Sequence, residues 1–339
     1  MPVDASDAIL RWYDSEKRAL PWRSAAPDPY RVWLSEIMLQ QTTVAAVKPY
    51  FAAFLSRWPD IAAMAAADEG DVMAAWAGLG YYARARNLVA CARVIAANGG
   101  RFPDREAELL KLPGIGRYTA AAIAAIAFGR RAVVVDGNVE RVVSRLFAVA
   151  EPLPGARPKL YALADSITPE VRSGDFAQAM MDLGRTICTP RRPDCGRCPL
   201  AGGCAGFISG TPELYPVKAP KRDRPHRQGF AYWLEHRGHV LLERRPAKGL
   251  LGGMNALPTG VWAERAVPSE PVKASWSNAG SVDHVFTHFS LTLTLQCAEL
   301  SSARPDGFWW PVARIDEAGL PTVFAKLVAR GLEWRKAAA

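Results

Sequence analysis

Histidine is missing from the first two-thirds of this 339-residue chain, since all five histidines lie beyond position 225. Any catalysis in the preceding region must therefore use other groups, and carboxylates are the first candidates. Long apolar runs are also missing, because no uncharged stretch approaches the ~18 residues that a membrane span requires. The first seven residues, Met1-Pro-Val-Asp-Ala-Ser-Asp, carry acidic and no basic side chains. A secretory signal would instead begin with basic residues and continue with apolar ones. We therefore expect a cytoplasmic protein that is not associated with a membrane.

Strong compositional bias is missing as well. Half of the residues are hydrophobic and 22% are charged, which excludes disordered and collagen-like chains. The length suffices for two domains. The net charge of +9 favours a polyanionic partner but does not identify one.

The pattern of apolar residues divides the chain into three parts. Residues 1–210 show helical spacing. One predicted helix starts at Pro29 with Asp28 as its N-cap, and another spans 82–98 with Leu88, Val89, Val94 and Ile95 facing inward. Residues 211–228 are basic and rich in proline, and are predicted to form a linker. Residues 229–339 contain strand-like alternation and a final helix. The predicted fold is an all-α region followed by a small α+β domain.

Four of the six cysteines are crowded into one segment, with the spacing Cys188-x6-Cys195-x2-Cys198-x5-Cys204. Four thiolates this close in sequence can bind zinc or an iron–sulfur cluster. The alternative is four buried cysteines without metal, which the clustering disfavours.

A pair of glycines, Gly114 and Gly116, lies between two predicted helices. The segment matches the dinucleotide-binding pattern GxGxxA, but that pattern requires a preceding strand. We predict instead a helix-hairpin-helix, in which the glycines allow close backbone approach and the second helix can bind a phosphate at its start. An ordinary turn between helices would leave the same pattern.

Two carboxylates in apolar surroundings are candidate catalytic groups. Burial of Glu36 within the apolar segment 32–42 would raise its pKa and allow it to act as a general acid. The alternative is a solvated glutamate on a helix face. Asp136 follows an apolar run, where it could cap the next helix or supply a fixed negative charge.

Together these segments resemble the helix-hairpin-helix DNA glycosylases, and among them the adenine-specific branch. The matching segments occur in the family's order: Leu20-Pro-Trp-Arg, Ser35-Glu-Ile-Met-Leu-Gln-Gln-Thr, Gly78-Leu-Gly-Tyr-Tyr-Ala-Arg-Ala-Arg-Asn, Leu112-Pro-Gly-Ile-Gly-Arg-Tyr-Thr-Ala, Val135-Asp-Gly-Asn-Val and the four cysteines. The resemblance implies a six-helix barrel over about residues 22–130 and a cluster domain from about 1–21 and 131–210. It also implies one 4Fe-4S cluster on Cys188, Cys195, Cys198 and Cys204, which we therefore prefer to zinc.

The resemblance further implies a reaction. Bifunctional relatives have a lysine where this chain has Tyr118, so we expect a monofunctional glycosylase that excises adenine mispaired with 8-oxoguanine or guanine, in base excision repair. Glu36 would protonate the flipped adenine, Asp136 would stabilise the oxocarbenium-like sugar or bond to it, and Tyr118 and Asn138 would position them. The alternatives are an endonuclease III-like pyrimidine glycosylase with AP-lyase activity and a non-catalytic DNA-binding protein.

The same resemblance implies the residues that contact duplex DNA. Gln41 and Tyr81, with Leu39, Thr42 and Leu79 beside them, would fill the gap and hold the opposite strand, and Gly114 and Gly116 belong to the hairpin. Arg18, Trp22 and Arg23 match residues around the adenine pocket. The candidates for phosphate contacts are Arg84, Arg86, Arg117, Arg141, Arg191, Arg192 and Arg197.

Residues 229–339 resemble the MutT-like domain of these glycosylases in the segments Leu251-Gly-Gly-Met-Asn-Ala-Leu-Pro, Val285-Phe-Thr-His-Phe and Leu320-Pro-Thr-Val-Phe. A Nudix hydrolase needs a set of carboxylates on one helix to hold magnesium, whereas only Glu264 and Glu270 are scattered here. Pyrophosphohydrolase activity is therefore not expected. The resemblance implies 8-oxoguanine recognition by Phe286, Thr287 and His288, in a monomer associated with the nucleoid.

Overall fold

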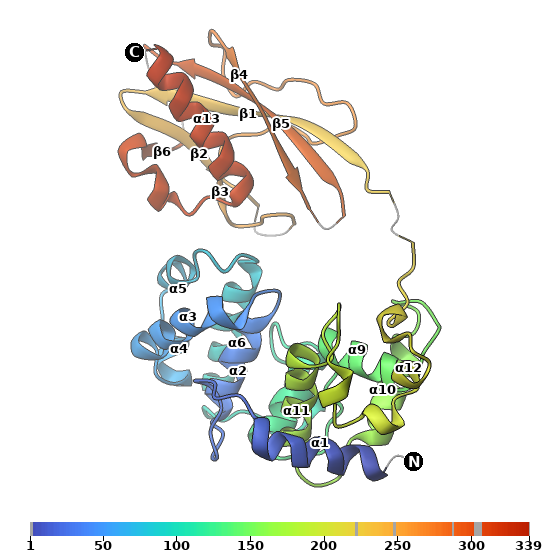
Figure 1. The fold of residues 1–339 in the computed structure, drawn as a ribbon. Helices are drawn as coiled ribbons and strands as arrows, with labels where there is room; N and C mark the ends of the chain where they lie inside the picture. The colour runs from blue at the N-terminus through green and yellow to red at the C-terminus, as the bar shows by residue number, and fades with distance from the viewer. Residues whose placement is uncertain (1–2, 221–222, 247–248, 287, 302–306, 339) are drawn as a thin grey trace. The chain divides into compact units, whose positions relative to one another are not determined.

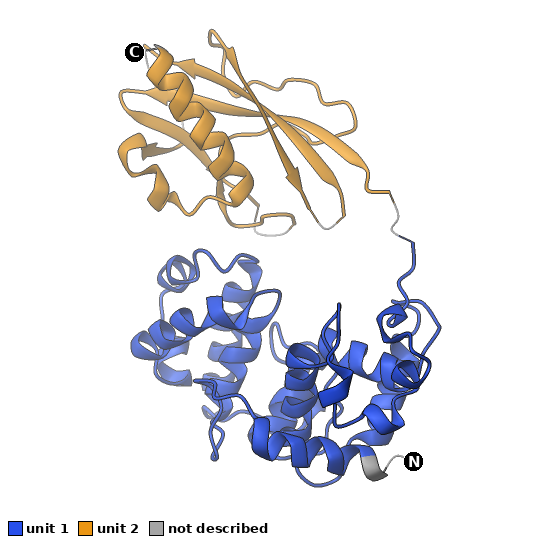
Figure 2. Ribbon diagram, viewed as in Figure 1, with its two compact units in different colours: residues 1–220 blue, residues 221–339 orange. Residues whose placement is uncertain are grey.

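The computed structural model describes residues 3–220, 223–246, 249–286, 288–301 and 307–338. The chain divides into two compact units, residues 1–220 and 221–339 (Figure 2). The first unit is helical and the second is built on a sheet (Figure 1). In the described ranges, no helix is both long and apolar enough to cross a membrane. The predicted fold class is confirmed.

The α-helices of the first unit are α1 (Val3–Glu16), α2 (Pro29–Leu39), α3 (Val44–Arg57), α4 (Ile61–Ala66), α5 (Glu69–Ala75), α6 (Ala83–Ala97), α7 (Glu106–Leu109), α8 (Arg117–Phe128), α9 (Gly137–Leu146), α10 (Arg157–Ile167), α11 (Ser173–Thr186) and α12 (Ala205–Ile208). Two short 3-10 helices lie within the cysteine segment, η1 (Cys195–Arg197) and η2 (Ala201–Gly203), and a third, η3 (Pro212–Leu214), lies at the start of the predicted linker.

Two apolar cores stabilise the helical unit. The first is formed mainly by α2 to α8 and includes the fully buried Trp33, Phe54 and Trp76. The second is formed by α1 with α9 to α11 and includes Ile9 and Leu183. Helix α1 contributes to the second core, helices α2 to α8 form the first, and α9 to α11 complete the second. The segments around residues 17–23 and 132–138 therefore connect the two cores.

Local sequence explains how the elements at this boundary begin and turn. Asp28 caps α2, because its side chain accepts a hydrogen bond of 2.8 Å from the backbone N–H of Tyr30, with Pro29 in the first turn. The predicted hairpin joins α7 to α8. Gly114 there has a φ of 74°, and a Cβ would lie 2.6 Å from the Cβ of Asn87, so this turn requires glycine.

The second unit is a mixed sheet with the strand order β3-β2-β1-β5-β4, and β6 also pairs with β2. The strands are β1 (His226–His236), β2 (His239–Arg244), β3 (Asn255–Ala256), β4 (Ser277–Val285), β5 (Ser290–Glu299) and β6 (Phe308–Pro311), and the 3-10 helix η4 (Val312–Ala318) precedes α13 (Thr322–Ala338). β1 and β5 are parallel, from His226 opposite Ser290 to Glu235 opposite Glu299. Alternate leucines of β5 are buried in one core with Phe324 and Leu327 of α13, as the alternation predicts.

The segment predicted as a linker is shorter than 211–228. At its start, Leu153 of the helical unit donates to the Val217 carbonyl and accepts from the Ala219 N–H. At its end, His226 already pairs with Ser290 in the sheet. Both ends are therefore held by backbone hydrogen bonds that a proline-rich composition does not reveal.

Candidate active site

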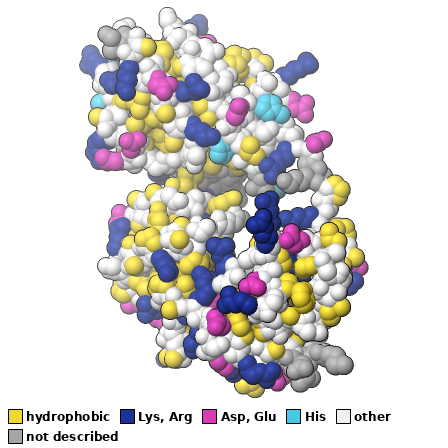
Figure 3. Space-filling view, in the orientation of Figure 1, with side chains coloured by type: hydrophobic (Ala, Val, Ile, Leu, Met, Phe, Trp, Pro, Cys, Tyr) yellow, Lys and Arg dark blue, Asp and Glu magenta, His cyan; other side chains and the backbone are white. Residues whose placement is uncertain are grey.

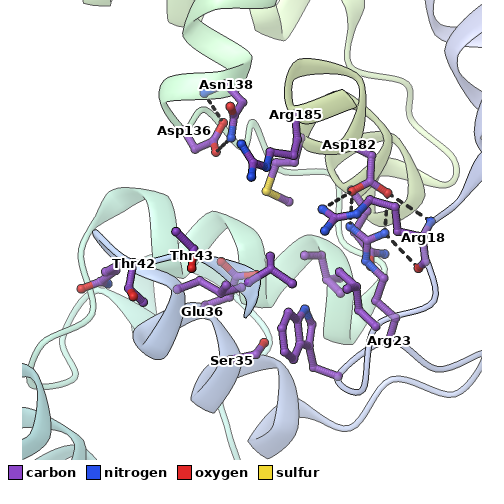
Figure 4. Close-up of a pocket in the computed structure, with 18 of the residues that line it drawn as sticks. Arg18, Arg23, Ser35, Glu36, Thr42, Thr43, Asp136, Asn138, Asp182 and Arg185 are labelled. Atoms are coloured by element: carbon purple, nitrogen blue, oxygen red, sulfur yellow. Dashed lines mark hydrogen bonds and ion pairs between the residues drawn. The ribbon is translucent and has the colours of Figure 1, made fainter. Parts of the chain in front are cut away.

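A cavity of about 590 Å³ lies in the helical unit, and both cores contribute to its walls (Figure 4). Of the predicted residues, it is lined by Arg18, Trp22, Arg23, Glu36, Leu39, Gln41, Thr42, Tyr118, Asp136 and Asn138. Predicted residues up to 120 positions apart in sequence, Arg18 and Asn138, thus line one space with the proposed acid and the second carboxylate.

Glu36, on α2, is only 5% exposed. The Tyr118 hydroxyl, on α8, donates a hydrogen bond of 2.7 Å to its Oε2. Burial raises the pKa of Glu36 to about 7; the charge of Asp136 adds to this effect, while the Tyr118 hydrogen bond and Arg23 oppose it. Glu36 is therefore partly protonated near neutral pH and can donate a proton. It is not a solvated residue on a helix face.

Tyr118 faces the carboxylates from the first turn of α8. Burial, together with the charges of Glu36 and Asp136, raises the pKa of its phenol well above the ordinary value. Its hydroxyl thus stays protonated and acts as a hydrogen-bond donor. Within the described part of the chain, no lysine lines this cavity.

Asp136 takes the capping role, which is one of the two that the sequence allows, and its functional role stays a prediction. It caps α9, because Oδ1 accepts hydrogen bonds from the backbone N–H groups of Asn138 (2.9 Å) and Val139 (2.7 Å). Its Oδ2 accepts a third from the Asn138 side chain at 2.8 Å. These three hydrogen bonds hold the carboxylate in one orientation at the cavity wall.

Asp182, on α11, is a residue that sequence reasoning missed. It is 1% exposed and accepts hydrogen bonds from Arg23 and, at 3.4 Å, from Arg18 (Figure 4). The available signal was an acidic residue inside the otherwise apolar stretch Met180-Met-Asp-Leu-Gly. The pairing holds the two arginines beside the cavity.

The four clustered cysteines line a second, small and mostly apolar cavity with Leu146, Leu183, Ile187 and Leu200. Arg145, which is 2% exposed, donates from Nη1 to the Cys188 Sγ (3.3 Å) and to the Thr189 carbonyl (2.7 Å). Among the described residues, no three His, Cys, Asp or Glu side chains converge on a single metal ion. The four thiols around one apolar space, with a buried arginine beside them, are a ligand set that fits an iron–sulfur cluster, which takes one thiolate for each iron. When bound, the cluster supplies four iron–thiolate bonds that cross-link this loop.

Two arginines predicted to contact phosphates have their donors committed inside the protein. Arg141 donates to the Cys188 carbonyl (2.8 Å), the Gly184 carbonyl (2.6 Å) and the Asn138 Oδ1 (2.9 Å). Arg84 donates to five backbone carbonyls. In this structure backbone carbonyls and a side-chain amide, not a phosphate, occupy these guanidinium groups, which disfavours the predicted phosphate contacts for both. Phosphate contacts by Arg86, Arg117, Arg191, Arg192 and Arg197 stay predictions.

The residues predicted to enter the duplex lie on two loops with unusual backbone geometry. Gln41 and Tyr81 have positive φ angles of 59° and 48°, and Tyr81 is 58% exposed. Such conformations cost free energy and are concentrated at functional sites. Leu79 is only 6% exposed, so its side chain packs beneath its loop, and its contact with DNA stays a prediction.

The predicted reading loop of the second unit connects β4 to β5. The Phe286 N–H donates to the Phe289 carbonyl (2.9 Å), and the Phe286 ring contacts the rings of His284, Phe289 and Trp262. His288 is exposed, and Thr287 lies outside the described residues. Residues 257–276 form no helix, and Glu264 and Glu270 there are exposed. The lack of pyrophosphohydrolase activity stays a prediction.

Three family models match the chain. Residues 34–161 match the HhH-GPD superfamily of base excision DNA repair proteins, residues 188–204 the iron-sulfur binding domain of endonuclease III, and residues 229–330 the NUDIX domain. The cluster loop and the sheet unit are thus matched separately from the helical part.

Curated relatives match over most of the chain. Adenine DNA glycosylase from Homo sapiens is 36% identical, covering 88% of this chain and 67% of the human protein. The adenine DNA glycosylase of Buchnera aphidicola subsp. Schizaphis graminum is 31% identical, covering 95% of this chain and 97% of its own. That of Mycolicibacterium smegmatis is 43% identical over 60% of this chain and 71% of its own.

Solved structures agree with the helical part. A thermostable thymine-DNA glycosylase is 32% identical with a TM-score of 0.56, covering 60% of this chain and 95% of that protein. A non-covalent endonuclease III–DNA complex, at 24% identity and a TM-score of 0.52, shares the fold. Because the human and Buchnera relatives are more than 30% identical and the matches span two thirds or more of each, the chain belongs to the adenine DNA glycosylases of the HhH-GPD superfamily.

Proposed function

We propose that this protein, acting as a monomer, removes adenine mispaired with 8-oxoguanine or guanine from duplex DNA and leaves the strand uncut. One observation carries the proposal: a buried acid with a pKa near neutrality, Glu36, lines the same cavity as the fixed carboxylate Asp136. The names of the relatives support adenine as the base.

The first step is departure of the base. The bond between adenine N9 and the sugar C1′ weakens as adenine gains a proton and the sugar gains positive charge. Tyr118 already donates to Oε2 of Glu36, so the acidic proton is carried on Oε1, where it can pass to adenine N7. Asp136 is held in place by its three donors, and its carboxylate stabilises the cationic sugar.

The second step is addition of water. Glu36, now ionised, can take a proton from the water molecule that attacks C1′, and its acid form is restored. The products are free adenine and a sugar that carries a hydroxyl group at C1′. Because Tyr118 faces the site and no lysine among the described residues lines it, we expect no Schiff base between an amine and the sugar and no cleavage of the backbone.

The proposed duplex partner suits the charge of the chain. The net charge is +9, and dark blue Lys and Arg side chains are numerous on the visible face of the helical unit (Figure 3). The hairpin adds backbone N–H groups at the start of α8, whose N-cap is Gly116, where a phosphate can bind. We assign recognition of 8-oxoguanine to the loop that contains Phe286 and His288.

The test is single-turnover release of adenine from a duplex that carries adenine opposite 8-oxoguanine, with and without alkali. Strand breaks only after alkali are expected. Breaks without alkali, trapped by borohydride, would instead indicate an endonuclease III-like lyase. A duplex that is bound tightly without release of any base would indicate a binding protein.

A further inference from the structure

One guanidinium group joins the two loops that are proposed to enter DNA. Arg84, near the start of α6, donates from Nη1 to the carbonyls of Ile37, Met38 and Gln40, and from Nη2 to those of Leu79 and Gly80, at 2.5–3.3 Å. The first three carbonyls belong to the end of α2 and the residue after it. The other two belong to the loop between α5 and α6.

Each set of carbonyls is adjacent to a strained, DNA-facing residue. Gln40 precedes Gln41 (φ 59°), and Gly80 precedes Tyr81 (φ 48°). The carbonyls at the end of α2 lack partners within the helix, and Arg84 supplies hydrogen bonds that hold the α2 terminus against the second loop. The guanidinium carbon also lies 5.6 Å from the centre of the Tyr81 ring and 5.2 Å from that of Trp76.

Neighbouring contacts fix one loop but do not bridge the two. Trp76 Nε1 donates to the Gly80 carbonyl (3.0 Å), and Tyr50 donates to the Ala77 carbonyl (2.6 Å). Both bonds end on the loop between α5 and α6. The hydrogen bonds of Arg84, by contrast, join the loop between α5 and α6 to residues 37–40.

We propose that Arg84 is a positioning residue that holds Gln41 and Tyr81 at the separation needed to displace adenine from the base stack. The proposal rests on the proposed function. Extruding a base from a duplex costs a few kcal/mol, and two side chains that enter the duplex can offset that cost only if their loops stay in place. Arg84 therefore acts on base displacement and not on cleavage of the glycosidic bond.

Lysine should not replace Arg84 well. A planar guanidinium presents five donors in a fixed fork, whereas an ammonium group presents three from a single atom. Arg84→Lys retains the charge but cannot satisfy carbonyls on both loops at once. If Arg84 acted only through charge, this variant would behave like the wild type.

The experiment compares two substrates. In one duplex adenine is opposite 8-oxoguanine; in the other it is opposite an abasic-site analogue, so that it is unpaired and easier to displace. Arg84→Met and Arg84→Lys are expected to lower the single-turnover rate about 10- to 100-fold on the mispair, where tenfold corresponds to 1.36 kcal/mol in the barrier, and less than about 3-fold on the unpaired adenine. Equal losses on both substrates, or no loss, would overturn the proposal.

Arg93→Met is the matched control. Arg93 lies on the same helix and also donates to carbonyls, those of Ala65 and Ala67 at 3.3 and 3.2 Å, but these are remote from the DNA-facing loops. The ratio of its rates on the two substrates should equal that of the wild type. A ratio as altered as that of the Arg84 variants would indicate a general effect of α6 stability. Should Arg84→Met fail to fold, Arg84→Lys provides the measurement.

A second readout separates this inference from the proposed function. In a Glu36→Gln background, 2-aminopurine placed at the adenine position reports unstacking by its fluorescence, without chemistry. The fluorescence increase on binding should shrink when Arg84→Lys is added. An unchanged increase overturns the role of Arg84, whereas an inactive wild-type protein that still gives the increase overturns only the proposed function.

Discussion

Asp182 and Arg23 form a nearly buried, two-point ion pair: Arg23 Nη1 and Nη2 donate to the two carboxylate oxygens at 2.5 and 3.0 Å. The carboxylate is 1% exposed and the arginine side chain 14%. Because Arg23 acts to lower the pKa of Glu36, the negative partner of Arg23 moderates its effect on the proposed acid.

Asp182→Asn should therefore do two things. Loss of the carboxylate leaves Arg23 without a counter-charge, at a cost of about 3 kcal/mol in the free energy of unfolding. It should also lower the pKa of Glu36, so the rate of base release should begin to fall at lower pH than in the wild type. Chemical denaturation and a pH–rate profile measure the two effects.

Asp175→Asn on the same helix is the control. Asp175 pairs with Arg172 at 2.9 Å, but both side chains are about 40% exposed, and surface pairs contribute about 0–1 kcal/mol. A loss of stability in this variant as large as in Asp182→Asn would show that any charge removed from α11 has the same effect.

Glu36→Gln should abolish base release and leave duplex binding intact. In the wild type the pKa of about 7 predicts that the single-turnover rate falls as pH rises above 7, because the protonated acid is depleted. Substantial turnover by the glutamine variant would contradict the assignment of Glu36 as the acid.

The same residue predicts a pH-dependent stability. Because the folded-state pKa is raised from 4.5 to about 7, the native protein retains a proton that the unfolded chain releases, and its stability falls between these values as pH rises. Above pH 7 the full penalty is about 3 kcal/mol. Glu36→Gln should remove it, so the melting temperature of the variant should exceed that of the wild type more at pH 8 than at pH 5.

Asp136→Asn should also abolish base release, and its structural effect is specific. An asparagine can still accept the two backbone hydrogen bonds, but its amide would face the Asn138 Nδ2, now 2.8 Å from Oδ2. Asn138 cannot invert its amide without losing the hydrogen bond from Arg141. Two amide donors that face each other without an acceptor should lower the free energy of unfolding by about 1–3 kcal/mol.

Asp60→Asn tests whether that cost arises from capping alone. Asp60 caps α4 by accepting from the Ala63 N–H at 2.8 Å, and among the described residues no side chain donates a hydrogen bond to its carboxylate. Asparagine caps as well as aspartate, so denaturation midpoints should be nearly unchanged. An equal loss at both positions would remove the argument about Asn138.

Replacing the four cluster cysteines by serine should impair folding or DNA binding and not the chemical step. The reason is that the loop from Cys188 to Cys204 contains only short 3-10 helices and depends on metal–thiolate bonds for its shape. Iron content, thermal melting and duplex affinity measure this. Cys91→Ser, at a buried site outside the loop, should keep the iron; an iron-free variant that is stable and binds DNA tightly would contradict the prediction.

Short sequence patterns correctly predicted the features that depend on interactions between residues close together in the chain. The caps at Asp28 and Asp136 and the hairpin glycines follow from short-range geometry. Along α6 the buried positions are Ala85, Leu88, Val89, Ala92 and Ile95, with Cys91, and Val94 lies off this stripe at 37% exposure. The prediction that Val94 faces inward was wrong, because apolar character alone does not place a residue on the buried face.

The sequence did not predict pairings between residues that are far apart along the chain. Asp182 contacts residues 159 and 164 positions away, and Arg84 contacts carbonyls whose positions depend on how α2 packs against α6. A sequence shows that an arginine is present but not whether a carbonyl, a carboxylate or a phosphate will occupy its donors. This is why Arg84 and Arg141 were assigned to DNA while the structure uses them internally.

The phenol of Tyr118 has a consequence for what must happen after the reaction. Its hydroxyl keeps its proton and lines the proposed site where bifunctional relatives have a lysine amine. If the proposed function holds, the product is therefore a continuous strand with one sugar that lacks its base. Such a site carries no coding information and opens readily to a reactive aldehyde. A second protein, one that hydrolyses or eliminates a phosphodiester at baseless sugars, must therefore take over each product, and the interval between the two enzymes is when the strand is most vulnerable.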